Sequence, residues 1–340
     1  MRPFAYERPQ DAEAAVALAA PSGSGSGSGS GSDEVAFLGG GTNLVDLMKL
    51  GVASPARVID VSRLPYDRVE HGANGGLRIG GAVRNSDLAA HPDVRALFPL
   101  VARATLNGAS GQIRNRATVA GNLLQRTRCP YFQDVSKPCN KREPGTGCPA
   151  REGANRELAI LGHSEACVAT HPSDLAVALA ACDAHVRVLG PDGERLIDFT
   201  DFHRLPGDQP QRDTVLEPAE LITHVELAPL ACARRSTYVK VRDRASFAFG
   251  LVSLAAAVDV AEDGTLTDVR LALGQVAHKP WRCTVAEDLL RGSAPSHAAF
   301  VAAADAELAA ARPLSDNGFK VPLARNLIVQ TLKQLVGKER

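Results

Sequence analysis

A long irregular stretch, residues 111–148, places the strongest constraint on how this chain can fold. It reads GQIRNRATVAGNLLQRTRCPYFQDVSKPCNKREPGTGC. Its first half contains small residues that let a backbone approach a ligand closely: Thr118, Val119, Ala120, Gly121 and Asn122. Its second half carries three cysteines among prolines, glycines and basic residues, and Cys167 follows. Irregular loops this long are uncommon unless something orders them, so the fold must supply that order.

The composition allows a multidomain globular protein and argues against several classes of partner. With 340 residues, 45% of them hydrophobic, the chain can form two or three domains with cores of their own. Its 38 Lys and Arg balance 38 Asp and Glu, so no global charge favours nucleic acid or an anionic membrane. The N-terminal residues lack the pattern of a secretory signal. No apolar run approaches the roughly 20 residues of a membrane span. We therefore expect no nucleic-acid partner, no membrane span and no signal peptide.

The hydrophobic pattern predicts mixed helices and strands with a change of character near residue 229. Residues 22–32 form a Gly/Ser tract that we expect to be a flexible surface loop. Expected strands before residue 229 are 2–7, 35–38, 57–61, 77–80, 167–170, 185–189 and 221–227, and expected helices are 12–20, 44–50, 86–98, 100–106 and 175–184. After residue 229 we expect antiparallel strands at 238–242, 250–260 and 269–274, followed by helices at 285–292, 297–311 and 323–337.

The first candidate binding element is a glycine turn between a strand and a helix. The strand Val35–Leu38 leads into Gly39, Gly40, Gly41, Thr42 and Asn43, and a helix follows. Backbone N–H groups of such a turn, together with a helix N-terminus, can bind phosphate. The pattern is neither the Rossmann nor the P-loop fingerprint, and a plain turn is the alternative. The second small-residue turn, Thr118–Asn122, strengthens the phosphate interpretation, since two turns could hold the two ends of a pyrophosphate.

The second candidate element is a set of four cysteines, Cys129, Cys139, Cys148 and Cys167. Their spacing matches neither a ferredoxin nor a zinc ribbon. Adjacent prolines and glycines suit a backbone that wraps a cluster, and nearby basic residues are expected to lower the pKa of the thiols. From the residues alone, a metal or cluster site and a set of free thiols both stay open. The remaining cysteines, Cys182, Cys232 and Cys283, are expected to be buried apolar residues.

The two turns and several further motifs resemble one known family. FLGGGTNLVDLMK and GQIRNRATVAGNLLQ resemble the FAD-binding medium subunit of the molybdenum hydroxylases, which include xanthine dehydrogenase and carbon monoxide dehydrogenase. RTRCPYF, KPCNKR, SEACVATHPSDLAVA and GQVAHKPWR are most similar to the periplasmic-type bacterial aldehyde oxidoreductase branch. The resemblance implies an α+β chain. Residues 1–228 would form a two-subdomain FAD-binding fold of the vanillyl-alcohol-oxidase (PCMH) type, with a cysteine cluster loop at 123–167. Residues 229–340 would form a CO-dehydrogenase-flavoprotein-like C-terminal domain.

The resemblance also implies site residues. FAD would contact Leu38, Gly39, Gly40, Gly41, Thr42, Asn43, Leu44, Val45, Thr118, Val119, Ala120, Gly121, Asn122, Asp174, Ile222 and Lys240. From the residues alone, Asp174 has the alternative of a simple helix N-cap. Lys240 has the alternative of a solvated strand residue. The four cysteines Cys129, Cys139, Cys148 and Cys167 would hold a 4Fe-4S cluster, with structural zinc as the alternative.

No catalytic side chain is expected in this chain. His163, His171, His203 and His278 stand singly in the sequence, and no nucleophile–base pair or carboxylate dyad is present, so a bound cofactor would carry the chemistry. The resemblance implies an electron-transfer subunit of a heterotrimer that oxidises aldehydes. A small 2Fe-2S subunit would pass electrons from a molybdenum-cofactor large subunit to FAD and an external electron acceptor. The location would be periplasmic, by co-export with a partner that carries a twin-arginine signal, or cytoplasmic.

Three alternatives stay open at this point. The chain could be the flavin subunit of a xanthine dehydrogenase or hydroxybenzoyl-CoA reductase type of enzyme. It could be a stand-alone FAD oxidase of the vanillyl-alcohol type, although no substrate domain or covalent flavin link is evident. It could also be a zinc-stabilised interaction module with a vestigial nucleotide site.

Overall fold

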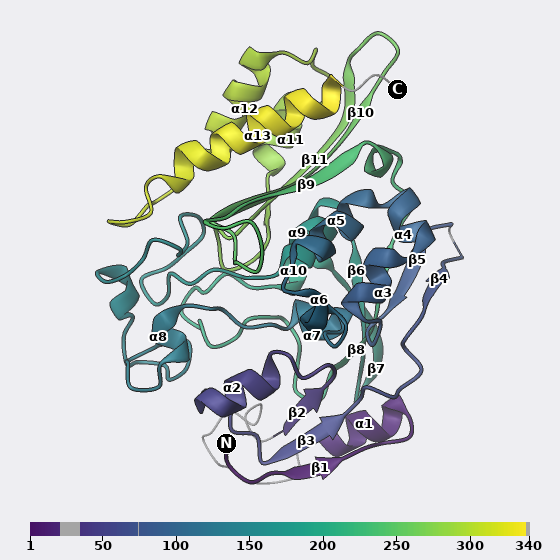
Figure 1. Ribbon diagram of the computed structural model, residues 1–340, viewed down its shortest axis with the longest axis vertical. Coiled ribbons are helices and arrows are strands. Elements are labelled where there is room, and N and C mark those ends of the chain that lie inside the picture. Colours follow the sequence, from purple (N-terminus) through teal and green to yellow (C-terminus); the bar gives the residue numbers. More distant parts are fainter. Residues whose placement is uncertain (21–34, 74, 338–340) are drawn as a thin grey trace.

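Three sheets follow one another along the long axis of the molecule (Figure 1). The computed structural model describes residues 1–20, 35–73 and 75–337, so the predicted Gly/Ser loop at 22–32 lies outside the described residues. A parallel sheet of three strands lies at one end, an antiparallel sheet of five in the middle and an antiparallel sheet of four at the other end. The cysteine loop extends to one side of the middle layer (Figure 1).

The first layer is a small α/β unit with strand order β1-β3-β2, all parallel. Its elements are β1 (Ala5–Glu7), α1 (Ala12–Ala19), β2 (Val35–Leu38), α2 (Leu44–Leu50) and β3 (Arg57–Asp60). Asp11 caps α1 by accepting from the backbone N–H of Ala14 at 2.7 Å, as its position predicts. Gly51 ends α2 in the left-handed conformation, at φ 76°. The strand before the glycine turn and the helix after it are therefore those the sequence predicts.

The middle layer is a five-stranded sheet with order β4-β5-β8-β6-β7. Its strands are β4 (Val69–His71), β5 (Leu77–Gly80), β6 (His185–Gly190), β7 (Gly193–Asp198) and β8 (Leu221–Leu227). Its helices are α3 (Asn85–Ala90), α4 (Pro92–Leu97), α5 (Pro99–Asn107), α6 (Gly111–Arg114), α7 (Val119–Leu123), α9 (Asp174–Ala181) and α10 (Phe199–Phe202). Pro191 and Asp192 form the two-residue turn of the β6–β7 hairpin, as predicted.

The helix predicted over residues 86–98 is wrong as a single element. It is two helices, α3 and α4, separated at His91, whose backbone is extended with ψ 128°. Pro92 follows, and its ring excludes the helical conformation from the residue before it. Helix α3 begins at Asn85, and its N-cap residue, Arg84, makes no side-chain capping hydrogen bond.

The third layer is the C-terminal antiparallel sheet with order β12-β11-β10-β9, which confirms the expected antiparallel strands. Its elements are η2 (Ala231–Arg234), β9 (Ser236–Val241), β10 (Val252–Val260), β11 (Leu266–Gly274), β12 (Trp281–Arg282), α11 (Thr284–Leu290), α12 (His297–Leu308) and α13 (Lys320–Val336). Helices α11, α12 and α13 pack together on one side, and α5 and α9 contact the strands from the middle layer. No helix in the described ranges is long and apolar enough to cross a membrane.

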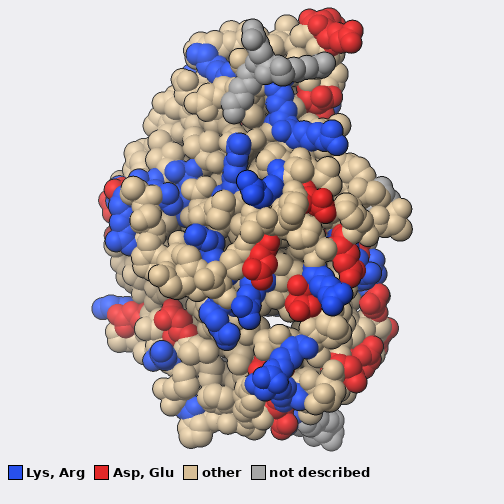
Figure 2. Space-filling model, turned by 45° about the vertical axis from the view of Figure 1, so that its right-hand side comes forward, with Lys and Arg blue, Asp and Glu red and all other residues tan. Residues whose placement is uncertain are grey.

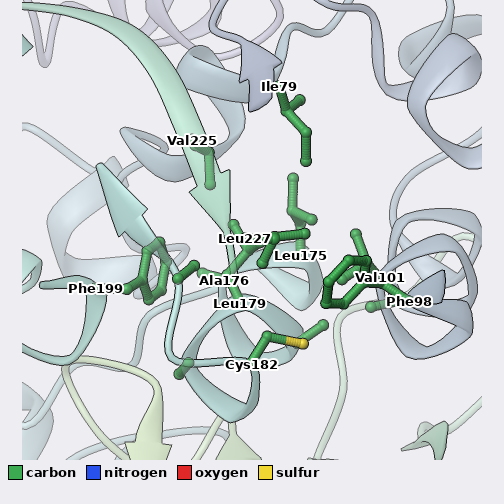
Figure 3. Packing of buried hydrophobic residues seen from close by; sticks show 14 of the residues in the cluster. Ile79, Phe98, Val101, Leu175, Ala176, Leu179, Cys182, Phe199, Val225 and Leu227 are labelled. Carbon is green, nitrogen blue, oxygen red and sulfur yellow. The ribbon is translucent and has the colours of Figure 1, made fainter. Parts of the chain in front are cut away.

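Helix α9 lies at the centre of the largest core, and all eight of its residues are buried. Leu175 and Leu179 pack in one cluster with Val225 and Leu227 of β8 (Figure 3). The same helix contacts β10 and β11 of the C-terminal sheet. Because α9 is surrounded on every side, it is hydrophobic all round rather than amphipathic. Its N-terminus, which carries Asp174, is thereby fixed between two sheets.

The cysteine loop between α7 and α9 contains only α8 (Pro130–Gln133) and η1 (Pro149–Arg151). The strand predicted at residues 167–170 is wrong. Val168 accepts one hydrogen bond from Ala159, and His171 donates one to Ala277, so the segment bonds to two different loops. Its apolar residues are buried among the cysteines instead of in a sheet. A buried apolar run looks the same in both settings, and the sequence does not separate them.

Candidate functional site

The two predicted turns meet backbone to backbone at the N-termini of α2 and α7. A Cβ atom on Gly40 would lie 1.9 Å from the carbonyl oxygen of Arg116 and 2.9 Å from the Cα atom of Ala117. A Cβ atom on Gly39 would lie 2.8 Å from Oγ1 of Thr118. The sequence pattern attributes these glycines to ligand approach. The structure gives a further reason, since only glycine lets the two turns touch.

The second turn is held by its own cap and by the middle sheet. Oγ1 of Thr118 accepts from the backbone N–H of Gly121 at 3.2 Å, which caps α7. Val119 and Ala120 donate to backbone carbonyls of residues 83 and 81, each at 2.9 Å. The carbonyl of Ile222 on β8 lies against Gly81, where an added Cβ atom would be 2.6 Å away. Ile222 therefore supports the turn from behind in this structure.

A cleft of about 670 Å³ opens beside the two turns. Six of the predicted contact residues line it: Thr42, Asn43, Gly121, Asn122, Asp174 and Lys240. The other ten lie in the turns, at the starts of the helices that follow them or in neighbouring strands, and do not line it: Leu38, Gly39, Gly40, Gly41, Leu44, Val45, Thr118, Val119, Ala120 and Ile222. The cleft therefore joins residues that are about 200 positions apart in sequence, since Thr42 and Lys240 share it.

A buried ion pair lies on the cleft wall. Lys240 Nζ donates to Oδ2 of Asp174 at 2.8 Å, and the two side chains are 1% and 5% exposed. The hydroxyl of Tyr238 donates to the other carboxylate oxygen at 2.6 Å, and burial beside this carboxylate raises the pKa of Tyr238. The alternative of Asp174 as a simple cap is wrong, because Ser173 caps α9 by accepting from Ala176 at 3.0 Å. The alternative of Lys240 as a solvated residue is wrong as well.

Two asparagines on the cleft wall carry buried polar atoms without partners among the described residues. Asn43 accepts from the backbone N–H of Arg126 at 3.0 Å through Oδ1, while its Nδ2 has no partner. Asn85 is 3% exposed and its Oδ1 has no partner. Buried polar groups are nearly always paired, so both atoms point to a polar ligand. The sequence interpretation missed Asn85 because a polar residue before a helix is usually a cap.

The loop after β9 closes another side of the cleft. Asp243, Arg244, Phe247, Ala248 and Phe249 all line it. Phe247 and Phe249 are 54% and 47% exposed. The guanidinium of Arg128 lies 5.3 Å from the ring centre of Phe249, within cation–π range. No sequence pattern marked this loop as part of a site. Over one face of the molecule, basic and acidic residues are mixed without a patch of one sign (Figure 2).

The four predicted cysteines line one small cavity of about 10 Å³. Cys129, Cys139 and Cys167 are buried, Cys148 is half-buried, and all four are free of disulfides. Within the part of the chain that the structure describes, no three His, Cys, Asp or Glu side chains could hold a single metal ion as they stand. A zinc ion needs four ligands at about 2.0–2.3 Å. The arrangement therefore gathers the thiols without building a mononuclear site.

The electrostatics of the cavity differ from the sequence expectation. Burial raises the pKa of Cys129 to about 11, so nearby basic residues do not lower it as predicted. Arg126 and Lys141 instead form salt bridges with Asp213. The thiol of Cys167 hydrogen-bonds to Cys148, which lowers the pKa of Cys148 and raises that of Cys167. Of these three cysteines, Cys148 therefore favours the thiolate, whereas Cys129 and Cys167 favour the thiol.

Side chains of the loop itself supply its order. Asn140 accepts from the backbone N–H groups of Gly145 and Gly147 at 3.1 and 2.7 Å and donates to the carbonyl of Ala166 at 3.0 Å. Lys141 is 2% exposed and its Nζ lies 3.0 Å from Nε2 of His278. The four histidines that stand singly in the sequence are all buried, so none faces solvent: His163, His171, His203 and His278.

The chain matches two described families over nearly its whole length. Residues 2–230 match the "FAD binding domain in molybdopterin dehydrogenase", and residues 237–336 match the "CO dehydrogenase flavoprotein C-terminal domain". The aldehyde oxidoreductase FAD-binding subunit PaoB of Escherichia coli (strain K12) is 50% identical over 299 residues, which is 88% of this chain and 90% of that protein. The carbon monoxide dehydrogenase medium chain of Hydrogenophaga pseudoflava is 26% identical over 304 residues, 88% of each chain.

Solved structures agree with these matches. The carbon monoxide dehydrogenase from Hydrogenophaga pseudoflava that lacks the Mo-pyranopterin moiety of its cofactor superposes with a TM-score of 0.73 at 25% identity, over 98% of both chains. The reconstituted CO dehydrogenase from Oligotropha carboxidovorans gives 0.74 at 19% identity, over 99% of both, which shows a shared fold. Together the matches confirm the predicted fold class.

Proposed function

This chain belongs to the family of FAD-binding medium subunits of the molybdenum hydroxylases, and on that basis we propose that it is the FAD- and 4Fe-4S-containing electron-transfer subunit of an aldehyde oxidoreductase. The aldehyde assignment rests on the 50% identity to the Escherichia coli subunit. We place the border between the FAD-binding domain and the C-terminal domain at residues 228 and 229.

The cleft of about 670 Å³ fits FAD on three observations. Two turns with helix N-termini lie at its edge, which suits a pyrophosphate. The unpaired buried atoms of Asn43 and Asn85 offer a donor and an acceptor to a polar ligand. The Asp174–Lys240 pair on the wall is shielded from water, where charges act strongly on a bound ring. The turns and the ion pair on one cleft are the observation that carries the proposal.

The residues of this chain would hold and shield the flavin and would not react. When bound, FAD supplies the transfer of one or two electrons. Lys240 donates to Asp174 and to the carbonyl of Asn107, which leaves one of its three N–H groups for a ligand in the cleft. Asp174, held by Tyr238 and Lys240, keeps that ammonium fixed. Residues of the loop 243–249 line the same cleft.

For the cysteine cavity we propose a 4Fe-4S cluster held by Cys129, Cys139, Cys148 and Cys167. The donor set supports this proposal, since four thiols free of disulfides line one cavity and four cysteine thiolates are the usual ligands of such a cluster. Loading such a cluster requires the four thiols to lose their protons and to move apart. Zinc remains the alternative occupant, and the metal analysis described below distinguishes it from an iron–sulfur cluster.

The proposed assembly is a heterotrimer with a molybdenum-cofactor large subunit and a small 2Fe-2S subunit. Electrons would pass from the 2Fe-2S clusters through FAD to an external acceptor. If the complex is periplasmic, it would be exported folded with a partner that carries a twin-arginine signal; otherwise it is cytoplasmic. The medium-chain relatives support the multi-subunit form by their names.

An absorption spectrum with metal analysis of the purified chain tests both cofactors. We expect flavin bands and a broad iron–sulfur shoulder that dithionite bleaches, with about four irons per chain. A colourless protein with one zinc would support the interaction-module alternative. A flavoprotein that co-purifies with no molybdenum-containing chain would support the stand-alone oxidase.

A further inference from the structure

A second cavity of about 350 Å³ lies between the flavin cleft and the cysteine cavity. It shares Arg128, Glu157, Pro172 and Phe249 with the flavin cleft and Cys129 with the cysteine cavity. Its size is within the usual range of small-molecule sites. None of the predicted FAD contacts lines it. The cavity thus shares one wall with the flavin cleft and adjoins the cysteine cavity.

Gln275 marks this cavity as a built polar site. It follows β11, has a left-handed backbone at φ 59°, and is 3% exposed. Its Oε1 and Nε2 both lack partners among the described residues. An added Cβ atom on Gly250 would lie 2.7 Å from Oε1, so the amide lies directly over this glycine of the cavity wall. A buried amide with a free donor and a free acceptor points to a ligand that offers both.

The wall around the amide is held rigidly by a buried lysine. Lys320 is 0% exposed and donates from Nζ to the carbonyls of Gln275, Glu157 and Leu158 at 2.8, 2.8 and 3.0 Å. All three acceptor residues line the cavity. The backbone of Gln275 is therefore held in place without a ligand, which favours a preorganised cavity wall.

The remaining lining narrows the class of ligand. The walls include Pro130, Leu158 and Pro172, which favour an apolar ring. Arg128 makes no salt bridge among the described residues, whereas Arg156 is paired with Asp243. One free cation beside the carboxylate of Glu157 does not favour a highly charged anion. The volume is about half that of the flavin cleft, which excludes a second dinucleotide.

We propose that this cavity binds a small quinone as the external electron acceptor, with Gln275 as its specificity-determining residue; the inference rests on the proposed flavin function. Nε2 of Gln275 donates to the oxygen of the quinone, and Oε1 accepts from the O–H of the hydroquinone. An amide therefore suits both oxidation states of the ring. Conversion of quinone to hydroquinone adds two electrons and two protons, and a reduced flavin supplies both as it returns to its oxidised form.

Duroquinone is a suitable probe because its four methyl groups prevent addition of cysteine thiols. Titration calorimetry on the oxidised, FAD-loaded complex should show binding that Gln275→Leu weakens at least tenfold. Gln275→Asn keeps a residue that tolerates positive φ while it withdraws the amide, and it should weaken binding as well. Gln211→Leu, the same change outside this cavity, should bind like the parent protein. Oxidation of the dithionite-reduced complex by duroquinone should slow about tenfold in Gln275→Leu, while oxidation by ferricyanide stays within twofold.

The same samples distinguish failure of the quinone-site inference from failure of the proposed flavin function. Equal duroquinone binding by the parent, Gln275→Leu and Gln275→Asn proteins would overturn the inference, as would NAD⁺ binding that depends on Gln275 in place of duroquinone. Loss of FAD on duroquinone binding would place the cavity within the flavin site and overturn it too. Absence of FAD from the purified parent protein would instead contradict the proposed flavin function.

Discussion

The flavin cleft and the cysteine cavity are ordered in opposite ways. The cleft is made by regular elements from three layers, whose backbones touch where glycine allows it. The cysteine cavity lies in a loop with only α8 and η1, and side-chain hydrogen bonds such as those of Asn140 give it form. The comparison teaches that a site built from backbone contacts depends on residues far apart in sequence. A site built within one loop depends on its own side chains.

The largest effect is expected from breaking the buried ion pair of the cleft. Lys240→Met leaves Asp174 buried without its cation, and such a change destabilises a protein by about 3–5 kcal/mol. Urea denaturation of the apoprotein measures it, and FAD should be lost as well. The double variant Lys240→Met/Asp174→Leu should recover most of the stability and none of the FAD. If it stays as unstable as the single variant, the pair is not the source of the loss.

A somewhat smaller effect is expected from the glycine contact between the turns. Gly40→Val places a side chain against the carbonyl of Arg116, and overpacking of this kind costs about 1–3 kcal/mol or more. The FAD content of the purified chain should fall below one-tenth, while its iron content is retained. Gly111→Ala is the matched control, because an added Cβ atom there meets nothing within 4 Å. Normal FAD content in the Gly40→Val variant would show that the two turns do not hold the pyrophosphate together.

A variant in the cysteine loop tests whether the proposed cluster site is independent of the flavin cleft. Cys139→Ser should abolish the 4Fe-4S cluster and lower the melting temperature by a few degrees, about 1 kcal/mol, while FAD is at least partly retained. Iron analysis and the flavin spectrum measure the two outcomes. Cys182→Ala, at a buried cysteine in the main core, should keep all its iron. Full iron in Cys139→Ser would take this residue out of the ligand set, and equal loss of FAD would contradict the independence of the two sites.

The smallest effect is expected at Asn85, the residue that the sequence did not reveal. Asn85→Ala removes an unpaired buried oxygen, so the apoprotein should be as stable as the parent or slightly more stable. FAD should bind about fivefold more weakly, since one hydrogen bond contributes about 1 kcal/mol. A fluorescence titration of the apoprotein with FAD measures this. Unchanged affinity would show that Asn85 does not face the flavin.

Most of the fold and part of the site could be predicted from the sequence. The glycine turn, the hairpin at Pro191 and the antiparallel C-terminal sheet follow from local patterns that the structure confirms. The break at His91 could have been predicted from Pro92. The burial of Lys240 could not, because it results from the packing of β9 against α5 and from the pairing of Lys240 with Asp174, a residue far away in sequence. For the same reason the unpaired amide of Gln275 has no signature in the sequence.

The spread of the cleft over the chain has a consequence for the order of assembly during synthesis. The four cysteines are complete once residue 167 has left the ribosome, and their ordering contacts from Asn140 are local. The cleft lacks a wall until Lys240 and the loop after it have been made and Lys240 has paired with Asp174. The four proposed cluster ligands are therefore made before the residues that complete the flavin cleft, while the contacts of their loop with Asp213 and His278 form later. A chain truncated before residue 236 would have neither the Asp174–Lys240 pair nor a complete flavin cleft.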